Sequence, residues 1–178
     1  MDVFCEYIIK KKKEAKEILL ISALIIAGIL LSVFGFVLAA VFASEISFSI
    51  YVAALIVIWY FVYIYITRQN IEYEFTFTNG ESDVDQIFSR KRRVHMLSVR
   101  VREFEICAKI NDERYKNEFE KAKHLKKIYS AHSSSKSENV YFADFYLKAE
   151  KVRLIFEPSI NMINKMKLYN EKNIHLKE

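Results

Sequence analysis

The residue types that usually carry catalysis or bind cofactors occur in this chain, but not at the spacings that such chemistry needs. The histidines form no H-x-x-x-H pair and no set with closely spaced cysteines, so we predict surface histidines and no metal site. No serine lies in a G-x-S-x-G sequence, and the chain has only 3 glycines, so neither a serine nucleophile nor a phosphate-binding loop is expected. We therefore predict no catalytic residue, no cofactor and no enzymatic activity. The histidines are His95, His124, His132 and His175.

An acidic series and two cysteines are the remaining candidates for chemistry. Glu81, Asp83 and Asp85 have oxygens that could bind a cation, but their alternation is typical of the solvent side of a strand. We predict that they pair with basic residues of the next strand, which are Arg100 and Arg102. Two cysteines alone do not make a disulfide framework, and they suit a reducing compartment. These cysteines are Cys5 and Cys107, and the second is expected to pack in a sheet.

Basic residues gather in two runs, one near the start of the chain and one in its middle. Beside a membrane span, such residues set topology and attract anionic lipid, at about 1 kcal/mol for each well-placed side chain. The second run could be solvated, could contact lipid, or could bind nucleic-acid phosphates. We predict no nucleic-acid partner, because the chain has no helix-turn-helix and its nearby aromatic residues have a core pattern. The candidate anionic-lipid contacts are Lys10, Lys11, Lys12, Lys13, Lys16, Arg90, Lys91, Arg92 and Arg93.

Two uncharged runs, Ile18–Ala43 and Ile46–Thr67, predict a transmembrane helical hairpin. A helix needs about 20 apolar residues to cross the hydrocarbon core, and both runs are long enough. Only Ser44 and Glu45 separate them, so the two helices must be antiparallel neighbours. Lysines precede the first run and Arg68 follows the second, whereas the turn has neither Lys nor Arg. The positive-inside rule therefore predicts a multi-pass protein of the cell membrane with both termini cytoplasmic.

Two groups of residues within the hairpin have a spacing that suggests a role. Small residues recur on one face of the first run, where they let another helix approach closely. We favour packing on the second run, near Ala53 and Ala54, over homodimerisation. Aromatic residues near the end of the second run predict a membrane-interface belt, although packing on a neighbouring helix is an alternative. The helix-packing face is Gly28, Ser32, Gly35 and Ala39, and the belt is Trp59, Tyr60, Tyr63 and Tyr65.

The rest of the chain, residues 68–178, predicts one cytoplasmic β-rich domain, and residues 1–17 are expected to be a separate basic cytoplasmic segment. Apolar and polar residues alternate from Ile71 to Phe88 around Asn79-Gly80, which indicates a β-hairpin with a type I′ turn. This register would set Thr78 opposite Glu81, Thr76 opposite Asp83 and Glu74 opposite Asp85. Further strands are expected at 97–101, 104–110, 140–147 and 152–157, with a bend near residue 102.

Two helices are expected in this domain. Helical spacing from Asn111 to Ile128, after the potential cap Asp112, predicts an amphipathic helix. Ser159 is expected to cap a terminal helix that ends near residue 170 and turns Ile160, Ile163 and Met166 to the core. The serine-rich stretch between them, residues 132–139, predicts a flexible loop. The fold class is thus α+β, with a transmembrane hairpin followed by an antiparallel β-rich domain and a C-terminal helix.

The ending KVRLIFEPSINMINKMKLY (151–169) resembles the last strand and capping helix of bacterial pleckstrin-homology-like (PH-like) domains. The run IEYEFTFTNGESDVDQIFSRKRRVHMLSVRVREFEI (71–106), with the later RLIFEP, is similar to an uncharacterised family of small two-span proteins from Gram-positive anaerobic bacteria. The helix expected at 111–128 departs from the simplest PH-like pattern. The resemblance implies a fold and no particular activity.

We expect a membrane-anchored interaction or scaffold module, bound to the lipid bilayer and to a protein partner. One alternative is a sensor of anionic lipid headgroups at the inner leaflet. The other alternative is an enzyme, which would need a set of catalytic residues that the sequence does not show.

Overall fold

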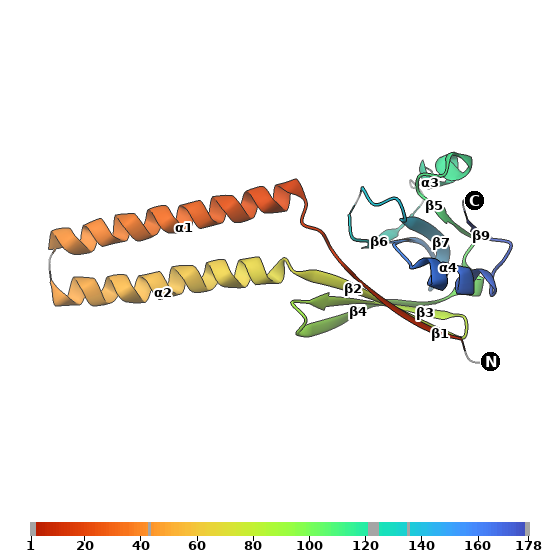
Figure 1. Cartoon of the computed structure of the whole chain (residues 1–178), viewed down its shortest axis with the longest axis horizontal. Coiled ribbons are helices and arrows are strands. Elements are labelled where there is room, and N and C mark those ends of the chain that lie inside the picture. The colour runs from red at the N-terminus through yellow and green to blue at the C-terminus, as the bar shows by residue number, and fades with distance from the viewer. Residues whose placement is uncertain (1–2, 43, 121–124, 135, 177–178) are drawn as a thin grey trace. The chain divides into compact units, whose positions relative to one another are not determined.

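The computed structural model describes residues 3–42, 44–120, 125–134 and 136–176. These residues form two compact units. One unit is helical and comprises residues 13–70, and the other is β-rich and joins residues 1–12 to residues 71–178. The β-rich unit therefore contains both ends of the described chain (Figure 1).

The helical unit is a hairpin of α1 (Ala15–Phe42) and α2 (Glu45–Arg68). Ser44 caps α2, because its side chain accepts a hydrogen bond from the Ser47 backbone N–H. Both helices are long and apolar enough to cross a membrane. The antiparallel hairpin predicted from the two uncharged runs is thus present as a pair of helices.

The first sheet has four antiparallel strands in the order β1 (Phe4–Lys10), β2 (Ile71–Thr78), β3 (Glu81–Phe88) and β4 (Arg92–Arg100). The expectation that residues 1–17 form a separate segment is wrong, because β1 pairs with β2 along its whole length. Ile9 is buried in the core of the domain. The alternation of apolar and polar residues in β1 is short and lies beside four lysines. The segment was therefore predicted to be a basic segment and not a strand.

The predicted turn between β2 and β3 is confirmed, with the predicted register on either side. Asn79 and Gly80 have φ values of 49° and 92°, as a type I′ turn requires. Gly80 is also needed for space, because a Cβ atom there would lie 2.6 Å from Cδ1 of Tyr169. Any other residue at position 80 would therefore have to displace the Tyr169 ring.

The second sheet has five strands in the order β6 (Lys127–Ala131), β8 (Glu150–Phe156), β7 (Tyr141–Leu147), β5 (Ile106–Lys109) and β9 (Ile174–His175). At the bend expected near residue 102, the chain forms the 3-10 helix η1 (Val101–Glu103) and passes from the first sheet to the second. The tight turn between β7 and β8 has positive φ at Lys148 and Ala149. β6 and β9 add parallel pairings to an otherwise antiparallel sheet.

The helix expected from residue 111 to residue 128 is wrong in extent. Asp112 does cap a helical turn, η2 (Glu113–Tyr115), which leads into α3 (Lys116–Glu120). Residues 121–124 lie outside the described part of the chain, and the predicted helix position Ala122 is among them. The end of the expected helix is strand β6, because its backbone pairs with the distant β8. A non-local pairing has overridden the local helical spacing.

α3 is attached to the second sheet through a buried arginine. Arg153 of β8 is 1% exposed, and its Nε and Nη2 lie 2.6 and 2.7 Å from the two carboxylate oxygens of Asp144 on β7. It also donates hydrogen bonds to the backbone oxygens of Phe119 at 2.5 Å and Glu118 at 2.9 Å. The guanidinium carbon lies 5.0 Å from the centre of the Phe119 ring and 4.8 Å from that of the Phe142 ring, within the range of a cation–π contact with each. Arg153 thus connects two strands and α3.

The core lies between the two sheets and under α4 (Ile160–Lys167). Ser159 caps α4 as predicted, by accepting a hydrogen bond from the Met162 N–H. Met162, Ile163 and Met166 are buried, but Ile160 is 72% exposed, so its expected core position is wrong. Because the cap fixes the start of the helix, the face that meets the core begins at Met162 and Ile163 and continues at Met166.

Candidate functional site

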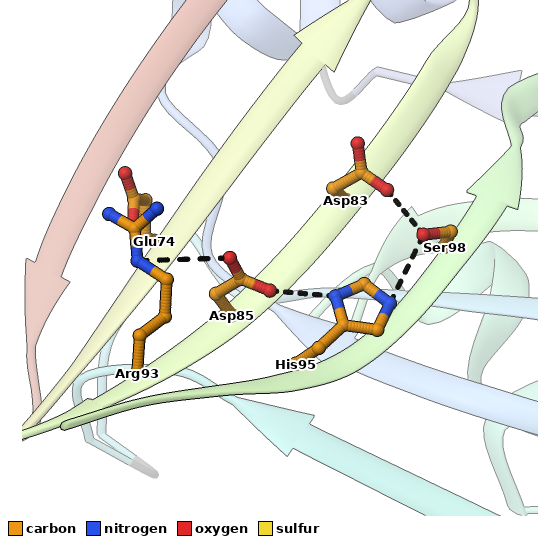
Figure 2. A network of polar contacts seen from close by, with 6 residues as sticks. All are labelled: Glu74, Asp83, Asp85, Arg93, His95 and Ser98. Atoms are coloured by element: carbon orange, nitrogen blue, oxygen red, sulfur yellow. Dashed lines mark hydrogen bonds and ion pairs between the residues drawn. The ribbon is translucent and has the colours of Figure 1, made fainter.

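A polar network covers the outer face of the first sheet, on β2, β3 and β4 (Figure 2). Alternate residues of a strand point to opposite faces, so His95 and Ser98 would not normally share one. Here Val84 stands opposite Leu97 whereas Asp85 stands opposite His95, which leaves Met96 as an extra residue in β4. This β-bulge brings His95 and Ser98 onto one face.

The network contains a serine, a histidine and an aspartate within hydrogen-bonding distance. Ser98 Oγ lies 3.1 Å from His95 Nε2, and His95 Nδ1 lies 2.7 Å from Asp85 Oδ1 (Figure 2). Ser98 Oγ also donates a hydrogen bond to Asp83 Oδ1. This second acceptor takes the hydroxyl proton that a catalytic histidine would have to remove.

Exposure also argues against hydrolytic chemistry at this network. The His95 side chain is 58% exposed, so water reaches the imidazole freely. Nucleophilic catalysis needs a shielded site with hydrogen-bond donors fixed around the reacting oxygen. The arrangement is therefore best understood as a hydrogen-bonded bridge between β3 and β4.

The predicted partners of the acidic series are wrong. Arg100 stands opposite Glu81 in the register, but its guanidinium pairs with Glu103. Arg102 lies in η1, beyond the end of β4. Asp83 is instead hydrogen-bonded to Ser98, and Asp85 contacts both His95 and Arg93. The His95 contact could be found from sequence only by inserting one unpaired residue into β4.

Glu74 is the buried member of this face, with 5% exposure. Arg93 Nη2 lies 2.5 Å from its Oε2, and Arg93 Nε lies 3.9 Å from Asp85 Oδ2 (Figure 2). Burial, together with a hydrogen bond to the Glu6 carboxyl, raises the pKa of Glu74 despite the nearby Arg93 charge. Arg93, a candidate lipid contact, is thus engaged by carboxylates of its own sheet.

The two basic runs lie at the same end of the first sheet, at its opposite edge strands β1 and β4. Lys10 ends β1 opposite Glu72, next to the start of β2, and the Lys11 N–H donates a hydrogen bond to the Ile71 oxygen. The β3–β4 turn lies at this same end, since Phe88 stands opposite both Ile71 and Arg92. We call this set the basic sheet end. It consists of Lys10, Lys11, Lys12, Arg90, Lys91, Arg92 and Arg93.

The other two candidate lipid contacts lie outside the β-rich unit. Lys13 precedes α1 and Lys16 lies in its first turn, so both belong to the helical unit. Within the basic sheet end, Arg90 pairs with Glu72 at 3.2 Å. The Lys12 N–H donates a hydrogen bond to the Ser133 oxygen, which fixes the backbone of the first run beside the serine-rich loop.

The serine-rich loop that was expected to be flexible is held by a carboxylate. Glu157 accepts hydrogen bonds from the Ser133 N–H at 2.9 Å and from the Ser137 hydroxyl at 2.6 Å. Burial by itself raises the pKa of Glu157, but these hydrogen bonds outweigh it and leave the pKa below its ordinary value. Because the pKa is lower in the folded state, this contribution to stability is present above the unfolded pKa and is lost as the pH falls through the folded pKa.

The small residues of α1 lie against α2. A Cβ atom on Gly28 would lie 3.7 Å from Val62, and one on Gly35 would lie 3.2 Å from Tyr51. Ala39 is buried on the same face. The Ser32 hydroxyl donates a hydrogen bond to a backbone oxygen of its own helix, so it leaves no unmatched polar group there.

The aromatic residues of α2 divide into two groups. Trp59 packs on α1, with Cη2 3.9 Å from a Cβ atom placed on Gly28, which lies midway along α1. Trp59 is nevertheless 40% exposed, and its place in a membrane-interface belt stays a prediction. Tyr60 and Tyr63 are exposed, and Tyr65 is partly exposed nearer the end of α2.

Comparison with known proteins gives one positive result. No curated protein and no solved structure matches the chain. A family model described as "Bacterial PH-like domain (DUF6106)" matches residues 1–176, which include β1, both long helices and the C-terminal helix. Two sheets with a closing C-terminal helix are consistent with that description. The chain therefore belongs to the bacterial PH-like domain family DUF6106.

Proposed function

We propose that this protein is a membrane-anchored interaction module without catalytic activity, whose β-rich domain binds a protein partner at the cytoplasmic surface. The observation that carries the proposal is the place of the hairpin in the chain. It is inserted between β1 and β2, which are paired neighbours in the sheet. Only residues 11–14 and 69–70 connect the two units, so the domain is attached by two short segments instead of one flexible linker.

The orientation is part of the proposal and can be tested separately. With Cys5 replaced by serine and the buried Cys107 retained, a cysteine at Glu45 should react with a membrane-impermeant maleimide on intact cells. A cysteine at the exposed Glu81 should react only after the cells are permeabilised. The opposite labelling pattern would place the domain outside the cell.

The partner can be tested with the full-length protein extracted gently from native membranes after chemical crosslinking. A partner of the folded domain should co-purify with the wild type and with Arg102→Ala, which changes an exposed residue. It should be lost with Arg153→Ala, which removes the buried link between β7, β8 and α3. Two results would argue against an interaction module of this kind. One is recovery of no specific protein, and the other is recovery of the same proteins with the wild type, Arg102→Ala and Arg153→Ala.

A second candidate function is contact with anionic lipid headgroups, and the basic sheet end favours it. The strand register supports this candidate, because Arg90–Arg93 lie at the same end of the first sheet as Lys10, after which the chain continues to α1. Each well-placed cation near an anionic surface contributes about 1 kcal/mol, and added salt screens it.

We expect this contact to depend on the lipid charge. In nanodiscs, a fluorophore on Lys91→Cys in the full-length protein should be quenched by headgroup-level quenchers more strongly when anionic lipid is present. The difference should vanish with Arg92→Gln and Lys10→Gln combined, or in high salt. The matched control is a fluorophore on Glu81→Cys, at the other end of β3, about 23 Å away at 3.3 Å per residue. Equal quenching at both positions would exclude a headgroup contact by the basic sheet end.

A further inference from the structure

A groove of about 470 Å³ runs between α1 and α2. Its α1 wall includes Leu24, Ala27 and Leu31, and its α2 wall includes Phe61 and Val62. In a bilayer, an empty apolar groove would lose dispersion contacts along its whole length. Some apolar group must therefore fill it when the hairpin is inserted as proposed above.

The ends of the groove differ in chemistry. One end contains Arg68, the single charged side chain in its lining, together with Tyr65. The other end reaches Leu31 of α1 and Ile58 of α2, just beyond the close approach of Gly28 to α2. Arg68 is exposed at the last turn of α2, and no ion pair in the described part of the chain involves it. A guanidinium suits a phosphate group, to which it can donate two parallel hydrogen bonds.

The length of the groove fits one leaflet of a bilayer. From Ile58 to Arg68 the helix rises about 15 Å, at 1.5 Å per residue. The hydrocarbon core is about 30 Å thick, so each leaflet contributes about 15 Å. A single acyl chain would thus extend from the headgroup level to the Leu31 and Ile58 end of the groove.

We propose that this groove binds one anionic phospholipid, with an acyl chain between α1 and α2 and its phosphate on Arg68. A second groove of about 270 Å³, nearer the hairpin turn, provides the contrast. It is lined by Gly35, Ala39 and Tyr51 among others, with no charged side chain in its described lining. A lipid in this second groove would therefore find no charged side chain to bind its headgroup.

The test is native mass spectrometry of the full-length protein released from mild detergent. The wild type should retain one anionic phospholipid, and Arg68→Gln should lower the retained fraction about tenfold, as expected for loss of a charge-assisted hydrogen-bond pair. Ala27→Phe should also abolish retention, because it fills the groove. Ala23→Phe, the same substitution at an exposed position outside the groove, should retain the lipid.

Other outcomes would overturn the proposal. Equal retention of zwitterionic lipid, unchanged by Arg68→Gln, would remove the role of the phosphate. Loss of the lipid with Arg92→Gln alone would move the site to the basic sheet end. A dimer that Ala27→Phe dissociates would show that a second copy occupies the groove. The inference rests on membrane insertion, so alkaline extraction of membranes is done first. Release of the wild type from the membranes would refute insertion itself. A protein that stays inserted but retains no lipid would refute only lipid binding in the groove.

Discussion

Arg153→Ala should destabilise the β-rich domain by about 3–5 kcal/mol, the usual cost of removing one partner of a buried ion pair. The substitution leaves the Asp144 carboxylate buried without its partner and removes the hydrogen bonds to the backbone of α3. Since small domains have only about 5–15 kcal/mol of stability, this is a large fraction of the total. Trp59 is the sole tryptophan and lies in α2, so unfolding is best followed by near-ultraviolet circular dichroism of the tyrosines.

Two controls separate the ion pair from other effects. Arg102→Ala removes an exposed guanidinium and should change stability by less than about 0.5 kcal/mol. The double variant Arg153→Met with Asp144→Leu should recover much of the loss, because apolar groups of similar size can replace a buried pair at little cost. If Arg153→Ala proves as stable as the wild type, the buried pair does not hold α3 to the sheet.

A fragment of residues 71–178, which lacks β1, should not form a soluble folded domain. The absence of β1 leaves the β2 edge unpaired and uncovers the core beside Ile9. Burial of an isoleucine alone contributes roughly 1.5–3 kcal/mol, and an open apolar edge strand promotes aggregation. Gel filtration of residues 71–178 should show aggregates in place of a monomer.

A matched variant supplies the missing strand without the helices. Lys10 stands opposite Glu72, and the Lys11 N–H donates to the Ile71 oxygen, so the two strands end side by side. Joining residues 3–11 to residues 71–178 through an Asn-Gly turn should therefore give a soluble monomer with a cooperative melting transition. A folded monomer from residues 71–178 alone would show that β1 is dispensable.

Sequence reasoning succeeded where a few neighbouring residues decide the structure. Asn79-Gly80 can hardly adopt anything but a tight turn between its two strands, so the register of β2 and β3 followed from it. Ser159 capped its helix for a similarly local reason. The two long apolar helices needed only length and hydropathy to be predicted.

The predictions from sequence failed where distant backbone segments or one inserted residue decide the structure. β6 exists because β8 pairs with it, although its sequence continues a helical spacing. β1 completes a sheet with strands that follow it by some sixty residues, and nothing local signals that pairing. In the polar network, a single bulge at Met96 gave Asp85 an unexpected partner, because it brought His95 onto the face of Ser98.

The insertion of the hairpin between β1 and β2 has a consequence for biosynthesis. During translation β1 leaves the ribosome before either span, and β2 leaves it after both. In the topology proposed above, the sheet can close only when the second helix has brought the chain back to the side of the membrane on which β1 lies. A protein with one span misinserted would keep an unpaired strand on each side of the membrane and would be open to proteolysis. Completion of the domain would thus act as a check on correct membrane insertion.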